Sequence, residues 1–278
     1  YVLALLGLFV VIREITARWA AGPPSPVRGA LLADVWWAFI LMVPPAILTY
    51  IASWFGWFIH PRAYGHGRSG ISGFGGALVD LWLYHREMWR FHNGLETPHT
   101  YQSNPYTWLA QIRPTSFHWA NGEAVTGCPS GNCATNVVAL GNPILWWIGI
   151  GALMLVVWGT FYYRNWRAGV ILTGYLALYV PWLGYAHRTI FTFYTVAFAP
   201  FVALAVAWMI GLLAGAVAPD GQPTVVPMPH RTEITGRVMA VGLTLAILAC
   251  ALWFLPLWRA DVVDYDFWRA HMWLPTWI

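Results

Sequence analysis

Long apolar stretches separated by short polar segments dominate the hydrophobic pattern of this chain. A membrane-spanning helix needs about 20 mostly apolar residues. The pattern therefore predicts an all-α, polytopic transmembrane helix bundle, with a kink or break at Pro44-Pro45 in the first complete span. The predicted complete spans are 30–59, 144–163, 169–185, 189–217 and 238–258.

An incomplete span precedes them. The apolar run at residues 1–12 would rise only about 18 Å as a helix, whereas the hydrocarbon core of a bilayer is about 30 Å thick. We interpret the run as the end of a cut span and expect the sequence to be the C-terminal part of a longer protein.

Composition supports a membrane protein. Charged residues make up 9% of the chain, against about 25% in a typical soluble domain. The net charge of +4 is therefore no sign of a nucleic-acid partner. In a chain of this kind membrane lipids are the expected surroundings, and the position of each charge matters more than the sum.

The arginines predict an orientation. The short segments 13–29, 164–167 and 218–237 contain seven arginines, whereas the short segment 184–188 contains only Arg188. Because short cytoplasmic loops are rich in basic residues, the first three segments are expected in the cytoplasm. We accordingly expect a multi-pass protein of the cell membrane whose long loop faces the extracytoplasmic side. Its predicted parts are 1–59, 60–141 and 142–278.

The long loop carries two further signals. Apolar and aromatic residues recur at helical spacing over 78–92, which predicts a helix lying at the membrane surface. Cys128 and Cys133, in CPSGNC, favour a small disulfide in an oxidising compartment. A metal pair or free thiols are the alternatives. We predict no metal site, because no second pair of ligands stands nearby in sequence.

The polar strip HTYQSNPYTWLAQIRP, residues 99–114, follows the predicted surface helix. Its polar side chains could hydrogen-bond a sugar or a peptide backbone. The alternative is an ordered cap without any ligand contact, because loops need internal hydrogen bonds in any case. The candidate residues are Tyr101, Gln102, Ser103, Asn104 and Arg113.

Arg188 is the sharpest single candidate, because it opens a predicted span at the level of the lipid headgroups. A cation at a helix N-terminus is well placed to bind phosphate, helped by the free N–H groups and the helix dipole. His187 could donate to the same phosphate. The alternative is an arginine that snorkels to ordinary lipid headgroups.

Asp80 and Glu87 could share one helix face, seven residues apart. Ion pairs with Arg86 or Arg90 are favoured over catalysis by this pair. No metalloprotease motif, P-loop or Ser-His-Asp arrangement is present in the sequence. Asn142 is expected to cap the span that begins at Pro143.

Together the motifs resemble one family, the bacterial protein O-mannosyltransferases of actinobacterial type, over about residues 30–260 of this chain. One departure is Thr100, where that family commonly has proline after the histidine. The segments that carry the resemblance are HREMWRFHNGL (85–95), HTYQSNPYTWLAQIRP (99–114), ALGNPILWW (139–147) and RTIFTFY (188–194) followed by Pro200.

The resemblance implies a fold of the large-loop membrane glycosyltransferase type and a reaction. Mannose would pass, with inversion, from a polyprenyl-phosphate-mannose donor to Ser or Thr of secreted proteins, without a cofactor. The catalytic Asp-Glu pair of such enzymes would lie upstream of Tyr1, so no catalytic residue is assigned in this chain.

The physical demands of that reaction assign the site residues. Arg188, with His187 or Tyr194, would bind the donor phosphate. Tyr101, Gln102, Ser103 and Asn104 would bind acceptor or sugar, with Arg113 and Glu87 shaping the wall. The alternatives are a non-catalytic scaffold or lipid-binding subunit, a transporter, or transfer of another lipid-linked sugar.

Overall fold

The computed structural model describes residues 2–22, 24–218 and 230–278. The chain forms two compact units, Leu3–Thr97 and Pro98–Ile278. The division between them falls inside the predicted outer segment 60–141. Most of the predicted cytoplasmic loop 218–237 lies outside the described residues.

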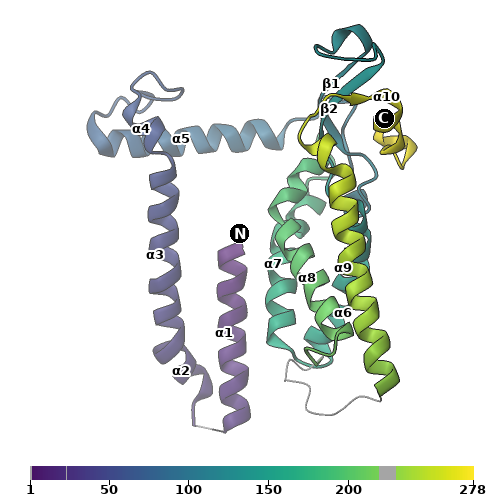
Figure 1. The fold of residues 1–278 in the computed structure, drawn as a ribbon. Coiled ribbons are helices and arrows are strands. Elements are labelled where there is room, and N and C mark those ends of the chain that lie inside the picture. Colours follow the sequence, from purple (N-terminus) through teal and green to yellow (C-terminus); the bar gives the residue numbers. More distant parts are fainter. Residues whose placement is uncertain (1, 23, 219–229) are drawn as a thin grey trace. The chain divides into compact units, whose positions relative to one another are not determined.

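The first unit is built from helices (Figure 1). Its elements are α1 (Val2–Ala21), α2 (Pro26–Ala30), a π-helical turn (Leu31–Val35), α3 (Trp36–Ser53), α4 (Phe55–Ile59) and α5 (Gly73–Asn93). Helix α1 continues past the predicted end near Ile12. Arg18 near its end donates from Nε to Oδ2 of Asp34 at 3.0 Å, which ties α1 to the π-helical turn.

Of the kink or break predicted at Pro44-Pro45, the structure contradicts the break. Helical structure is continuous over Pro26–Ser53, a stretch of 28 residues that is apolar enough to cross a membrane. The interruption comes instead at Trp54, whose ψ of 7° leaves the helical region. Lipid offers no water to satisfy backbone groups, so a spanning helix tolerates proline where a soluble helix would end.

Helix α5 covers the predicted surface helix 78–92 and runs crosswise to α3 (Figure 1). Asp80, only 2% exposed, accepts hydrogen bonds from the backbone N–H groups of Gly67 at 2.8 Å and Ser69 at 2.7 Å. Burial alone would raise the pKa of the Asp80 carboxyl. The hydrogen bonds from Ser69 and Gly67 outweigh that effect, so this pKa lies below its ordinary value of 3.8. The ionised carboxylate of Asp80 thus holds the glycine-rich segment 65–76 in place.

The second unit contains the predicted C-terminal spans. They are α6 (Pro143–Phe161), α7 (Trp166–Leu183), α8 (Ala199–Leu213) and α9 (His230–Trp258). As predicted, Asn142 caps α6, because its side chain accepts the N–H of Leu145 at 3.0 Å. By length and composition α6 and Glu233–Trp258 can cross a membrane, while α8 is a shorter apolar helix.

One span differs from the prediction. The stretch 189–217 was expected to be a single helix, but α8 begins only at Ala199, after a 3-10 turn at Thr192–Ala197. Residues 188–191 precede both helices and are not helical. Arg188 therefore lies in a connecting segment and does not open a helix.

Glycines allow the helices of the second unit to approach closely. A Cβ added at Gly149 on α6 would lie 2.6 Å from Cγ1 of Val202 on α8, and one at Gly174 on α7 would lie 2.0 Å from the ring of Phe201. Small residues at helix contacts are typical of membrane bundles, where close packing holds helices together. The core formed this way also takes in Trp108, which is fully buried.

A small sheet was not predicted. Strands β1 (Thr115–Asn121), β2 (Cys133–Ala139) and β3 (Val263–Asp264) form an antiparallel sheet in the order β1-β2-β3. The β1–β2 register is irregular between Ser116 and His118, and β3 has two residues, so the alternation of apolar and polar positions is weak. The helical bundle is confirmed, with this sheet added at one end of it.

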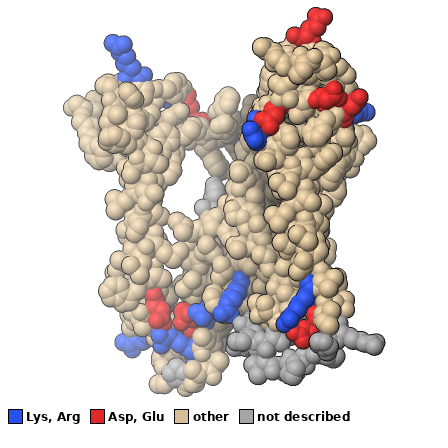
Figure 2. All heavy atoms as spheres, in the orientation of Figure 1, with Lys and Arg blue, Asp and Glu red and all other residues tan. Residues whose placement is uncertain are grey.

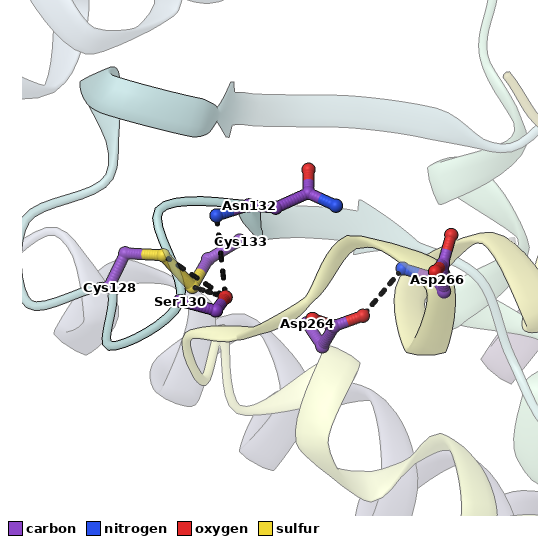
Figure 3. Close-up of a disulfide and its surroundings, with 6 residues drawn as sticks. All are labelled: Cys128, Ser130, Asn132, Cys133, Asp264 and Asp266. Atoms are coloured by element: carbon purple, nitrogen blue, oxygen red, sulfur yellow. Dashed lines mark hydrogen bonds between the residues drawn. A yellow bond between two sulfur atoms is a disulfide. The ribbon is translucent and has the colours of Figure 1, made fainter.

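The disulfide lies beside the sheet (Figure 3). Cys128 and Cys133 are bonded, with their Cα atoms 5.7 Å apart. The loop they close contacts the last part of the chain, because the N–H of Tyr265 donates to the carbonyl of Asn132 at 3.0 Å. Cys250 is a free, buried cysteine in α9.

Charge is distributed as expected for membrane helices. On the face shown in Figure 2, the charged side chains of each unit, taken by itself, gather towards the ends of its helices. In the second unit the connection between α6 and α7 lies at one end of the helices. The β1–β2 hairpin lies at the other end (Figure 1).

The disulfide predicts a labelling pattern. In intact protein denatured without reductant, an alkylating reagent should modify Cys250 and leave Cys128 and Cys133 unmodified, as mass spectrometry would show. After reduction all three cysteines should react. Alkylation of Cys128 and Cys133 without reductant would contradict the bond.

The role of Asp80 predicts a second result. The stabilisation from the ionised carboxylate is present above the ordinary pKa and is lost as the pH falls through the lowered pKa of the folded state. Asp80→Asn imitates that loss at neutral pH. Trypsin should then cleave after Arg68 about tenfold faster, because one backbone donor of the segment loses a charged acceptor. Asp266→Asn, at an exposed carboxylate, is the matched control, and equal cleavage rates in all three proteins would refute the role of Asp80.

Candidate functional site

Two segments singled out in the sequence lie together in the second unit. The polar strip 99–114 packs along 188–194, since the N–H of Ser103 donates to the carbonyl of Ile190 at 2.9 Å. The rings of His99 and Phe191 are 5.1 Å apart. Residues distant in sequence are thereby joined at the end of the bundle that carries the β1–β2 hairpin.

A directed chain of buried hydrogen bonds joins the two segments. The indole N–H of Trp108 donates to Oγ of Ser103 at 2.9 Å, and Oγ of Ser103 lies 3.0 Å from Oγ1 of Thr192. Thr192 donates its hydroxyl hydrogen to the carbonyl of Arg113. An indole only donates and a carbonyl only accepts, so each hydroxyl passes its hydrogen in one direction, from Trp108 towards Arg113.

These hydrogen bonds place Ser103 differently from the prediction. Ser103 is 5% exposed, and its hydroxyl both accepts from Trp108 and donates to Thr192. It lies inside the bundle and not on a polar rim. Linked hydrogen bonds in a low-dielectric interior strengthen one another, so the strip and segment 188–194 are held as one piece.

Arg188 lies where segment 188–194 begins. Its N–H donates to the carbonyl of Tyr185 at 3.1 Å, which closes a turn after α7. The guanidinium carbon lies 5.9 Å from the ring centre of Trp182 and 5.7 Å from that of Tyr185. Both distances allow a cation–π interaction. Two aromatic rings thus hold the guanidinium in place.

The electrostatics of Arg188 are unusual. The residue is 7% exposed, and within the described part of the chain its Nε has no hydrogen-bond partner. None of the ion pairs seen among the described residues involves it. A buried cation without a counter-ion costs several kcal/mol. An anion bound beside Arg188 would remove that cost.

The rationale for anion binding therefore changes. The dipole of a helix beginning at Arg188 was expected to assist, but α8 begins only at Ala199. The preceding helix, α7, ends at Leu183, and its C-terminal dipole favours a cation nearby. The features that favour an anion are the Nε of Arg188, which has no partner among the described residues, the burial of the side chain and the aromatic rings.

The other two donor-side candidates differ from each other. Tyr194 stacks on Trp182 with ring centres 4.3 Å apart, so it shares that ring with Arg188. His187 is exposed and lies next to Arg188 in sequence. Tyr194 thus packs against one ring that contacts the guanidinium, and His187 is accessible to a ligand.

Some of the remaining candidate residues of the strip are exposed, whereas the Arg113 side chain is already hydrogen-bonded within the protein. Gln102 and Asn104 are exposed and Tyr101 is half-buried, although the Asn104 side chain also accepts the N–H of Tyr106 at 3.1 Å. The Arg113 guanidinium is committed to main-chain oxygens, at 2.6 Å from Thr276. It does not extend as a free cation towards a ligand.

Glu87 belongs to the first unit and pairs with a different arginine from those expected. It accepts a hydrogen bond from the Tyr64 hydroxyl at 2.7 Å and forms an ion pair with Arg68, in place of Arg86 or Arg90. The bond from Tyr64 and then the one from Arg68 lower the pKa of the Glu87 carboxyl, against the opposing effect of burial. Its role here is to fix the segment that precedes α5.

Sequence reasoning missed three residues of the site. Trp182 and Tyr185 form the platform for Arg188, and Thr192 links the strip to segment 188–194. The first two lie within six residues of Arg188 in WLGYAHR, but their orientation depends on the turn that ends α7. Thr192 was read as part of a helix.

Metal ligation finds no support among the residues described. In that part of the chain no group of three or more His, Cys, Asp or Glu side chains could hold a metal ion. The cysteines that could have formed a metal pair are joined in the disulfide.

Known proteins share this organisation. A family model for the C-terminal four TMM region of protein-O-mannosyltransferase matches residues 77–277. A chain of the Saccharomyces cerevisiae protein O-mannosyltransferase Pmt1–Pmt2 complex, solved bound to the sugar donor, has a TM-score of 0.52 and 19% identity. The match covers 74% of this chain and 27% of that one. At that identity the likeness shows the fold alone.

Two curated relatives are bacterial. The polyprenol-phosphate-mannose–protein mannosyltransferase of Mycolicibacterium smegmatis is 29% identical, over all of this chain and 54% of the relative. The protein of the same name from Corynebacterium glutamicum is 27% identical, with the same coverage of both chains. This chain thus spans about half the length of these relatives. It is a membrane protein that belongs to the protein O-mannosyltransferase family and carries the C-terminal four-span region of that family.

Proposed function

We propose that this chain is the C-terminal part of an enzyme that transfers mannose from polyprenyl-phosphate-mannose to Ser or Thr of secreted proteins. Family membership supports the proposal, as do the names of the relatives, which specify that donor and a protein acceptor. The catalytic base is expected in the part of the protein that precedes this chain.

One observation carries the donor side of the proposal. The Arg188 guanidinium is buried on two aromatic rings, and its Nε has no partner among the described residues. A guanidinium presents several N–H donors in a planar fork that matches phosphate oxygens. The phosphate of the lipid donor is the anion that satisfies this group, with His187 as an exposed second donor and Tyr194 stacked on Trp182.

The reaction gives that cation a task. The acceptor hydroxyl oxygen bonds to C1 of mannose while the bond from C1 to the phosphate oxygen breaks, and the hydroxyl proton passes to the base. Polyprenyl phosphate then leaves with an additional negative charge. A fixed cation at this phosphate stabilises the charge as it develops. The donor supplies both sugar and leaving group, so the proposal requires no cofactor and no nucleic-acid partner.

The acceptor side rests on the exposed part of the polar strip. Gln102 and Asn104 are exposed and Tyr101 is half-buried, so their polar groups can meet an extended peptide or the transferred sugar. These residues adjoin Ser103, which bonds directly to segment 188–194. The residues proposed to bind the acceptor peptide and those proposed to bind the mannose donor thereby lie on neighbouring segments.

The proposed orientation follows from the arginines. The turn at 184–188 follows α7, whose opposite end carries Arg167 and the connection that contains Arg164. The positive-inside rule favours that connection in the cytoplasm. We therefore propose that the site faces the extracytoplasmic side of the cell membrane, where secreted acceptors pass and membrane lipids bring the donor.

Substitution of Arg188 in the full-length protein tests the donor role. Arg188→Ala should lower kcat/KM for mannosyl transfer about 100-fold, the typical loss when one group that stabilises developing charge is removed. Arg188→Lys should recover only part of the activity, because an ammonium lacks the planar fork. The measurement is transfer of labelled mannose from polyprenyl-phosphate-mannose to an acceptor peptide.

Arg167→Ala is the matched control. Arg167 also lies over an aromatic ring, 4.9 Å from the centre of Trp166, at the opposite end of α7. This variant should transfer mannose at the wild-type rate. Normal transfer by Arg188→Ala would reject the phosphate role.

A further inference from the structure

We propose that segment 272–278 is a positioning element for the donor site, and that it acts through Arg113 on the segment that carries Arg188. The inference rests on the proposed function, because the segment it positions is the proposed phosphate site. None of the residues of 272–278 need touch the substrate.

Three successive residues of the polar strip are bound by this segment. The indole N–H of Trp277 donates to the carbonyl of Gln111 at 2.7 Å, and the Thr276 hydroxyl donates to the carbonyl of Ile112. The Arg113 guanidinium in turn donates to the main-chain oxygens of Thr276 at 2.6 Å and Ile278 at 2.9 Å. The last residues of the described chain and residues 111–113 are thus bonded in both directions.

These contacts meet the strip at a strained point. Gln111 has a φ of 52°, in the left-handed region that residues other than glycine seldom adopt. It is 2% exposed, and its side-chain oxygen accepts the N–H of Gly141 at 2.9 Å. Such a conformation persists only where the surroundings fix it, and Trp277 supplies one of those constraints.

Arg113 passes the constraint to segment 188–194. Its guanidinium donates from Nε and Nη2 to the carbonyl of Thr100, at 3.3 and 3.2 Å, and lies 5.1 Å from the ring centre of Tyr101. Its own carbonyl accepts the hydroxyl of Thr192. One residue therefore holds segment 272–278, the polar strip and the segment that begins at Arg188.

The segment is itself anchored well enough to transmit position. Trp277 is 5% exposed and packs in a buried cluster with Leu140, Cys250 and Phe254. The Trp273 and Trp277 rings are stacked, with centres 6.4 Å apart. Helix α9, which supplies Cys250 and Phe254, thus serves as the fixed base.

Two near-isosteric substitutions in the full-length protein test the proposal. Thr276→Val removes the hydroxyl and Trp277→Phe removes the indole N–H, while each keeps most of the side-chain volume. Hydrogen exchange in 188–194 should become about tenfold faster in both, and KM for polyprenyl-phosphate-mannose should rise about tenfold, with a smaller change in KM for the acceptor peptide. Thr276→Ser, which keeps the hydroxyl, should restore both values.

Thr160→Val is the matched control. It removes a hydroxyl that donates to the carbonyl of Val156 at 2.8 Å within α6, so exchange in 188–194 and donor KM should not change. Arg188→Ala combined with Trp277→Phe should show no further rise in donor KM beyond Arg188→Ala alone, because the segment acts through the arginine.

The outcomes separate the two proposals. Unchanged exchange in 188–194, an unchanged donor KM, or additive effects in the double variant would overturn the positioning role. Faster exchange in a protein whose wild type transfers no mannose would uphold the coupling between the segments and reject the proposed function.

Discussion

The second unit depends on one constraint: buried hydrogen-bonding groups need partners, and residues 188–191 have no helix to provide them. The polar strip supplies the partners. The Ser103 hydroxyl accepts a hydrogen bond from the indole N–H of Trp108 and donates one to Thr192. The backbone N–H of Ser103 donates to the carbonyl of Ile190. This explains why an apolar chain contains a polar segment of this kind. The strip provides the hydrogen-bond partners that residues 188–191 lack because α8 begins only at Ala199.

One buried hydrogen-bonding group without a partner marks the proposed phosphate site. Arg188 is buried, but the described residues provide no partner for its Nε. Proteins tolerate such costs mainly at functional sites, where a ligand completes the interaction. The aromatic platform of Trp182 and Tyr185 holds the cation without neutralising it, which leaves its charge available to an anion.

The sequence predicted the features that depend on local pattern. Apolar stretches located the helices, and Asn142 before Pro143 was correctly expected to cap α6. Features that depend on contacts between residues far apart in the sequence were not predicted. The delayed start of α8 depends on the bonds of segment 188–194 to the strip, and the short strand β3 needs a partner more than a hundred residues away. Arg113 was expected at the acceptor wall, but two of the carbonyls that its guanidinium binds lie at the far end of the sequence, in Thr276 and Ile278.

Photo-crosslinking in the full-length protein would test the central claim most directly. The probe is a polyprenyl phosphate with a diazirine in the isoprene unit next to the phosphate, and mass spectrometry locates the adducts. If Arg188 binds the phosphate, adducts should appear within 182–194 and disappear when unlabelled polyprenyl phosphate competes. Competable adducts confined to other parts of the protein would contradict the account.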